Sequence, residues 1–148
     1  MSTIIQRGAG PRLAPALTAL ALVVAASALG WLATEPNLSW YDGLAKPSFN
    51  PPNAIFGPVW TTLYLLMAFA FWRILRLPRE TSGRASAIWL FLAQLTLNAA
   101  WSFLFFAGRN PLAGLVEIVP QWALVIATML AFFRLDPAAG WALAPLAL

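Results

Sequence analysis

The sequence contains no cysteine and no histidine, and these two absences exclude much of the chemistry that proteins commonly perform. Without cysteine the chain can form no disulfide, no thiol nucleophile and no thiolate-ligated metal centre. Without histidine it has neither the base of a serine–histidine triad nor the commonest axial ligand of haem iron. The glycine-rich signatures of nucleotide-binding loops are also absent. We therefore expect no metal site and no enzyme built on these groups.

Charged residues are scarce as well, at 9% of the 148 residues, against about 25% in a typical water-soluble domain. In their place, 61% of the residues are hydrophobic. Four apolar segments are long enough to cross about 30 Å of hydrocarbon as helices. They are Leu13–Ala33, Ala54–Trp72, Ala85–Gly108 and Asn110–Phe133, the last interrupted only by Glu117. We therefore expect an integral, multi-pass membrane protein of the all-α class.

The helices are predicted at about 13–33, 54–75, 85–108, 111–133 and 138–148, in one membrane domain spanning residues 1–148. The fifth stretch would reach only about 16 Å as a helix, roughly half of the hydrocarbon thickness. We therefore expect a polytopic helix bundle whose fifth helix is incomplete, and we interpret the chain end at Leu148 as a truncation.

The connection predicted at residues 34–53 combines prolines with aromatic residues. Pro47, Pro51 and Pro52 each fix φ and disfavour a helical conformation in the preceding residue, so no long helix can continue through them. Trp40 and Tyr41 give the same segment an apolar side. A stiff, aromatic connection at a membrane surface predicts a lid over one end of the bundle. A kinked linker with interfacial anchors is the alternative interpretation.

The arginines lie in the connections between apolar segments, which argues against nucleic acid as the reason for the net charge of +4. Seven basic residues fall on one side of the membrane and two on the other. The first set is Arg7, Arg12, Arg73, Arg76, Arg79, Arg84 and Arg134, and the second is Lys46 and Arg109. For an inner membrane, the positive-inside rule places the first set in the cytoplasm and the lid outside. A bacterial outer membrane is the other location considered, and the rule does not apply there.

Polar and aromatic side chains recur at helical spacing on faces that should point inward. Asn98, Trp101 and Ser102 share one face of the third helix, and Trp60 and Tyr64 share one face of the second. Amide groups are costly in hydrocarbon, so they should face a cavity or bond to a neighbouring helix. For Asn98, and for Gln94 and Gln121, both roles remain open. A cavity with such walls suits a flat, largely apolar ligand such as a metal-free tetrapyrrole, whose carboxylates could reach Lys46.

A specific signature runs through the lid and the second helix. Its residues are Trp40-Tyr41, Leu44, Lys46-Pro47, Pro51-Pro52, Phe56, Trp60, Leu63-Tyr64 and Met67. A second block consists of Gln94-Leu95, Asn98, Trp101-Ser102 and Phe105-Phe106. A third block consists of Glu117-Ile118, Trp122 and Ala127-Thr128. Over about residues 15–148 the chain resembles the TspO/MBR family of tryptophan-rich sensory proteins and translocator proteins, the peripheral-type benzodiazepine receptors.

The resemblance implies a five-helix bundle that forms homodimers, with small residues such as Ala26 and Gly30 allowing close helix contact. It also implies a membrane receptor or sensor that binds protoporphyrin IX and related flat apolar ligands, requires no cofactor, and regulates porphyrin metabolism or transport. Carried over by motif, the ligand-binding positions are Tyr41, Pro51, Trp60, Asn98, Trp101 and Ser102, with Tyr64 one turn from Trp60.

Two other functions are compatible with these residues. Some family members resemble light-dependent porphyrin-degrading enzymes, in which Trp60 would be catalytic. Their second tryptophan follows a Pro-Tyr pair in the fifth helix, whereas this chain reads Pro145-Leu146-Ala147-Leu148 and has no residue at that position. This difference weakens the enzymatic interpretation. The other alternative is a small proton-coupled exporter that uses Glu117 as its coupling acid.

Overall fold

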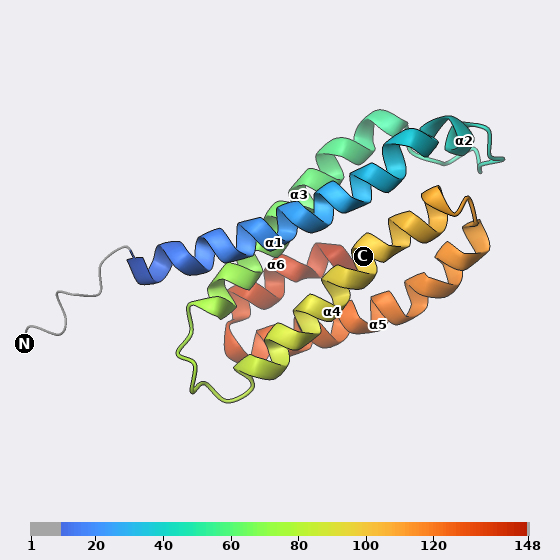
Figure 1. Cartoon of the computed structure of the whole chain (residues 1–148). Coiled ribbons are helices and arrows are strands. Elements are labelled where there is room, and N and C mark those ends of the chain that lie inside the picture. Colours follow the sequence, from blue (N-terminus) through green and yellow to red (C-terminus); the bar gives the residue numbers. More distant parts are fainter. Residues whose placement is uncertain (1–9, 148) are drawn as a thin grey trace, which may run out of the picture.

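The structure, a computed structural model, describes residues 10–147, with side chains from Leu13 onward. Most of the described chain is helical, and no strand occurs between residues 10 and 147 (Figure 1). The α-helices are α1 (Gly10–Thr34), α2 (Leu38–Asp42), α3 (Asn53–Leu75), α4 (Arg84–Ser102), α5 (Pro111–Leu135) and α6 (Pro137–Ala147). A 3₁₀ turn, η1 (Glu35–Asn37), joins α1 to α2, and a π-helical turn, η2 (Phe103–Ala107), ends α4. The predicted all-α class is confirmed; Arg7, the Arg12 side chain and Leu148 lie outside the described residues.

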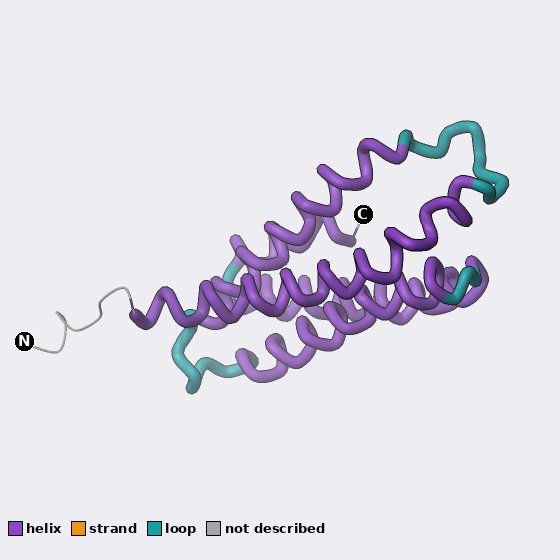
Figure 2. The backbone as a smooth tube through the Cα atoms, turned by 45° about the horizontal axis from the view of Figure 1, so that its top comes forward, coloured by secondary structure: helices purple, strands orange, loops and turns teal. Residues whose placement is uncertain are grey.

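Five helices form the bundle, and their neighbours define a ring. α1 packs against α3 and α4, α6 packs against α3 and α5, and α4 packs closely against α5. The order around the ring is therefore α1, α3, α6, α5, α4, and the tube view shows the long helices running side by side (Figure 2). Below, the end that carries residues 43–52 is called the lid end, and the end that carries residues 76–83 is called the arginine end.

Four spans are long and apolar enough to cross a membrane, as the sequence predicts. They are Leu13–Asp42, Asn53–Leu75, Arg84–Ala107 and Pro111–Leu135. Large apolar side chains cover the outside of these helices, which is the surface that a bilayer would contact. The protein is therefore a multi-pass membrane protein.

Aromatic packing fills the bundle near the arginine end. The rings of Phe71 and Phe91 stack with centroids 4.2 Å apart, and Phe91 and Phe132 stack at 5.9 Å. These three rings come from α3, α4 and α5, and all three are buried with Met67 and Ile74. Close-packed apolar contacts of this kind give the bundle most of its internal order.

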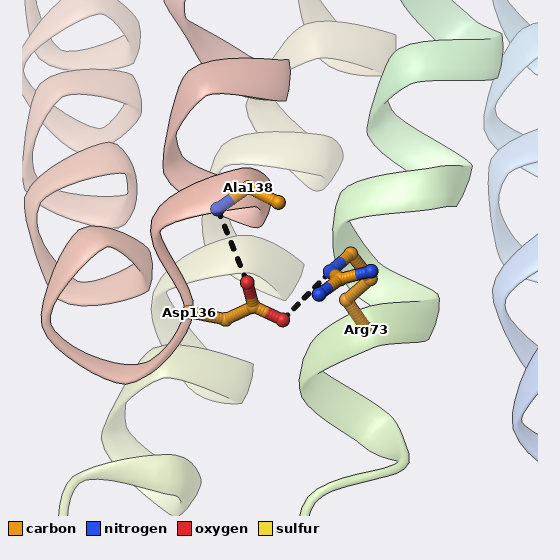
Figure 3. Close-up of polar contacts among 3 residues, drawn as sticks. All are labelled: Arg73, Asp136 and Ala138. Atoms are coloured by element: carbon orange, nitrogen blue, oxygen red, sulfur yellow. Dashed lines mark hydrogen bonds and ion pairs between the residues drawn. The ribbon is translucent and has the colours of Figure 1, made fainter.

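One carboxylate ties the corner between α5 and α6 to α3 (Figure 3). Asp136 Oδ1 accepts a 3.1 Å hydrogen bond from the backbone N–H of Ala138, so it caps the start of α6. Asp136 Oδ2 accepts a 2.7 Å hydrogen bond from Arg73 Nε. Burial by itself raises the pKa of Asp136, but Arg73 and the N–H groups of Ala138 and Ala139 outweigh burial and hold that pKa below its usual value.

The predicted lid boundaries need correction, because the first nine residues of the 34–53 segment are helical. η1 and α2 continue the first helix to Asp42, and only residues 43–52 form a loop. Pro36 is tolerated because it lies at the first turn of η1, where its missing N–H is not needed. Helical backbone therefore extends well beyond the boundary that the prolines suggested.

The proposed role of Ala26 and Gly30 in contacts between protomers is also not supported. Both residues are buried inside the protomer, where α1 meets its neighbours in the ring. A Cβ added at Gly30 would lie 3.3 Å from Ser102 Oγ and 3.8 Å from the Tyr64 hydroxyl. Gly30 therefore allows helices to approach each other within one chain.

Candidate ligand-binding cavity

A cavity of about 760 Å³ lies at the lid end, between α1, α3, α4 and α5 and beneath α2. Its volume falls in the range of about 300–1,000 Å³ that is typical of small-molecule sites. The walls are mainly aromatic and apolar, with a few polar groups from each helix. A second hollow of about 660 Å³ between α3, α5 and α6 shares Trp60, Ile118 and Gln121 with the first.

The structure brings together six of the seven residues that the motifs predict for the site. Those six line the cavity: Tyr41, Trp60, Tyr64, Asn98, Trp101 and Ser102. Pro51 does not line it. This proline is exposed in the loop just before α3, where it directs the chain into the helix instead of contacting the cavity.

The α4 wall of the cavity is a cluster of aromatic rings. Trp101 stacks on Phe105 with centroids 4.7 Å apart and meets Phe106 edge-on at 5.9 Å. The lid helix docks on this cluster, because Trp40 contacts Phe105 at 5.6 Å and Tyr41 contacts Phe106 at 5.6 Å. The π-helical turn of η2 places Phe105 and Phe106 at the end of α4, in reach of α2. The predicted lid therefore covers the lid end of the bundle.

The α3 wall carries the second aromatic pair, Trp60 and Tyr64. Their ring centroids are 5.8 Å apart, as expected for residues one helical turn apart on the same face. Trp60 is 36% exposed, so a large part of its ring is free to contact a ligand. Met67 and Phe71, further along the same face, are buried. The inward face predicted for this helix is confirmed.

Asn98 has both of the roles that the sequence left open. Its side chain is 4% exposed, and its Oδ1 accepts a 3.2 Å hydrogen bond from the Tyr64 hydroxyl, which joins α4 to α3. Asn98 as a residue lines the cavity, whereas its Nδ2 is buried and has no hydrogen-bond partner. Trp101 is anchored in a similar way, because its indole N–H donates to the Gly114 carbonyl at 3.1 Å.

Close approach of α4 and α5 at this point depends on Gly114. A Cβ at this position would lie 2.9 Å from Phe105 Cδ2 and 3.2 Å from Trp101 Nε1. Real Cβ atoms essentially never come within 3.0 Å of a neighbour, so the glycine allows the two helices and the indole to meet. The aromatic wall is therefore held in place by a small residue on the facing helix.

Sequence reasoning did not assign Gly30 to the cavity, and it left Gln121 between two roles. Gln121 lies on the buried face of α5, is 7% exposed, lines the cavity, and has an Oε1 with no hydrogen-bond partner. Glu117, one turn away, is 9% exposed and has no partner for either oxygen, but it does not line the cavity. Its role as a coupling acid stays a prediction.

The charged and polar groups at the cavity mouth are engaged with the lid. Asn53 Nδ2 donates to Asp42 Oδ1 at 2.9 Å, which links the end of α2 to the start of α3 across the loop. Lys46 Nζ lies 4.2 Å from the centroid of the Tyr41 ring and donates to the Tyr41 carbonyl at 3.2 Å. The lysine is therefore held against the lid helix, next to the cavity but outside its lining.

The fold and this cavity define an all-helical, multi-pass membrane protein with an aromatic pocket beneath a short lid helix. The chain belongs to the TspO/MBR family, whose family model matches residues 18–148.

Several curated proteins are similar to it. The tryptophan-rich protein TspO of Chlorobaculum tepidum is 40% identical over 127 residues, covering 85% of this chain and 80% of that protein. The tryptophan-rich sensory protein of Cereibacter sphaeroides is 44% identical over 101 residues, covering 68% and 61%. The translocator protein of Homo sapiens is 36% identical over 109 residues, covering 73% and 64%.

Proposed function

We propose that this protein is a membrane receptor or sensor that binds tetrapyrroles, protoporphyrin IX in particular, in the cavity beneath the lid, and thereby regulates porphyrin metabolism or transport. The observation that carries the proposal is the pair of facing aromatic walls. Trp60 and Tyr64 lie on one side, and Trp101 with its stacked Phe105 lies on the other. The names of the relatives, a sensory protein and a translocator protein, agree with a role in sensing or transport.

The geometry suits a flat ring system. Indole and phenol faces offer stacking surface to such a ligand, and most of the cavity wall is apolar. Asn98 and Ser102 supply polar contacts that would orient the ligand within the cavity. The ligand's carboxylates would project toward the mouth, where Lys46 lies beside Tyr41.

Intrinsic fluorescence provides the test, because the binding residues include tryptophans. Protoporphyrin IX should quench the fluorescence of the detergent-solubilised protein saturably. Trp60→Leu should weaken binding by about 1–2 kcal/mol, roughly 5- to 30-fold, the scale expected for losing an aromatic contact. Trp89→Leu is the matched control, since Trp89 is 72% exposed and does not line the cavity. Equal affinities in the parent and Trp60→Leu would show that Trp60 only packs between helices.

A homodimer is proposed from the family resemblance. Because Ala26 and Gly30 are buried within the protomer, the contacts between protomers must use other residues. Light scattering of the detergent-solubilised protein should give twice the protomer mass. Ala26→Leu should destabilise the protomer and leave that mass unchanged. A monomer mass in several mild detergents would contradict the proposal.

A further inference from the structure

At the arginine end, two neighbouring arginines of α3 are each held against an aromatic ring. Arg73 Cζ lies 5.6 Å from the centroid of the Phe69 ring, and Arg76 Cζ lies 4.7 Å from the centroid of the Trp72 ring. Arg73 is also held from a second side, because its Nε donates to Asp136 (Figure 3). Side chains that are already held in place lose less conformational freedom on binding, so these two cations are pre-organised for a partner.

Both guanidinium groups keep hydrogen-bond donors that the described residues do not use. The salt bridge of Arg73 engages Nε, and no hydrogen bond joins its two terminal nitrogens to the described part of the chain. Arg76 makes no side-chain hydrogen bond to any described residue. The terminal N–H groups of a guanidinium match the geometry of phosphate oxygens. Phosphate is therefore a group that suits the two arginines.

The same face of α3 continues toward the lid end as an apolar stripe. Leu65 and Phe69 are 61% and 41% exposed. Trp72 and Arg76 follow Phe69 at three and seven residues, which is the spacing of one helix face. From Leu65 to Arg76 the chain rises about 16 Å, close to half of the roughly 30 Å of hydrocarbon in a bilayer. Arg76 directly follows α3, where the apolar span ends, so this face has the length and polarity of one leaflet.

We propose that this face of α3 is a binding site for an anionic phospholipid. The phosphate lies at Arg73 and Arg76, and one acyl chain lies along the apolar stripe. Charge complementarity favours an anion, because five arginines stand against two carboxylates among the described side chains of the arginine end. The stripe favours a lipid over a free phosphate, which has no apolar part to place there. This site is independent of the proposed function, since the cavity lies at the lid end.

Native mass spectrometry of the detergent-solubilised protein tests the site with matched lipids. Dioleoylphosphatidylglycerol and dioleoylphosphatidylcholine have the same acyl chains and differ in net charge. The parent protein should bind the anionic lipid roughly 5- to 30-fold more tightly, the scale of one or two arginines near a lipid surface. Equal affinities would overturn the proposal. Excess inorganic phosphate should leave the anionic lipid bound, and displacement by phosphate would show a site for free anions instead.

Variants locate the site on α3. Arg76→Gln removes the charge at an exposed position, so the preference for the anionic lipid should fall about fivefold. Trp72→Leu should lower it about two- to threefold, because Arg76 loses the ring that holds it. Arg134→Gln is the matched control, since Arg134 is exposed at the same end but belongs to α5, with α6 between α5 and α3 in the ring. An equal loss in Arg134→Gln would indicate a diffuse attraction of charge and would overturn the site.

Discussion

At the scale of single residues, the motifs predict the aromatic part of the cavity better than its polar part. Tryptophan and tyrosine at fixed spacing are visible in a sequence, and Trp60, Tyr64 and Trp101 all line the cavity. Gly30 and Gln121 line the cavity only because their helices turn these two positions toward it. The helix that carries Gly30 is apolar on nearly every side, so no amphipathic stripe indicates which way Gly30 faces. The usable signal for Gln121 was its spacing of four residues from Glu117, which puts both on one buried face.

Asp136 gives a prediction about pH at the same scale. Its pKa is lowered in the folded protein, so the ionised form stabilises the fold above the usual carboxyl pKa, and this contribution is lost as the pH falls through the lowered folded-state value. Asp136→Asn keeps an oxygen to cap α6 but removes the charge that pairs with Arg73. It should cost about 1.5–3 kcal/mol at pH 7, the range for a hydrogen bond to a charged group.

Thermal unfolding in detergent from pH 7 to pH 3 checks this expectation. The gap in Tm between the parent and Asp136→Asn should be constant near neutral pH and should close below about pH 4. Glu80→Gln, in the exposed connection between α3 and α4, is the control and should change little. A gap that stays open at low pH would mean that the substitution acts through something other than charge.

At the scale of elements, the apolar runs predict most helices to within a few residues. The structure has α3 at Asn53–Leu75 and α6 at Pro137–Ala147, against predictions of 54–75 and 138–148. The extent of the helical turn in the lid and the π-helical turn were not predictable from the sequence, because tertiary contact decides both. The helical turn of α2 is stabilised by docking on aromatic rings of η2, and the π-helical hydrogen bonding of η2 leaves no mark on hydrophobic periodicity.

The docking of α2 leads to a prediction about the lid. Trp40→Ala removes the edge-on contact with Phe105, which is worth about 0.5–1.5 kcal/mol beyond buried area. Backbone amides of Leu38–Asp42 should then exchange with deuterium faster, and bound protoporphyrin IX should dissociate about 2- to 10-fold faster. Ser39→Ala, at an exposed position of the same helix, is the control. Unchanged exchange in Trp40→Ala would show that α2 is stable without this contact.

At the scale of the whole molecule, the order of the helices around the ring could not be predicted from the sequence, because each helix could present several apolar faces to a neighbour. What the sequence does define is the asymmetry of charge between the two ends. Arg73, Arg76, Arg79, Arg84 and Arg134 lie at the arginine end of the described structure, and Lys46 and Arg109 lie at the lid end. In an inner membrane this asymmetry predicts a cytoplasmic arginine end.

The absence of cysteine makes this orientation simple to measure. Ser48→Cys, in the exposed loop at the lid end, should react with a membrane-impermeant maleimide on intact spheroplasts. Ser82→Cys, in the exposed connection at the arginine end, should react only after the membrane is opened. The parent protein provides a background without thiols. The reverse pattern would show that charge does not determine the topology of this chain.

The stack of Phe71, Phe91 and Phe132 has a consequence for permeation. These rings close the axis of the bundle between the cavity and the arginine end, together with the buried Met67 and Ile74. None of the three rings lines the cavity, so in the described structure the cavity ends before it reaches them. The routes for a solute that do not disturb this packing are the lid end and the gaps between helices. Passage along the axis would require three stacked rings to separate, at the cost of contacts that hold α3, α4 and α5 together.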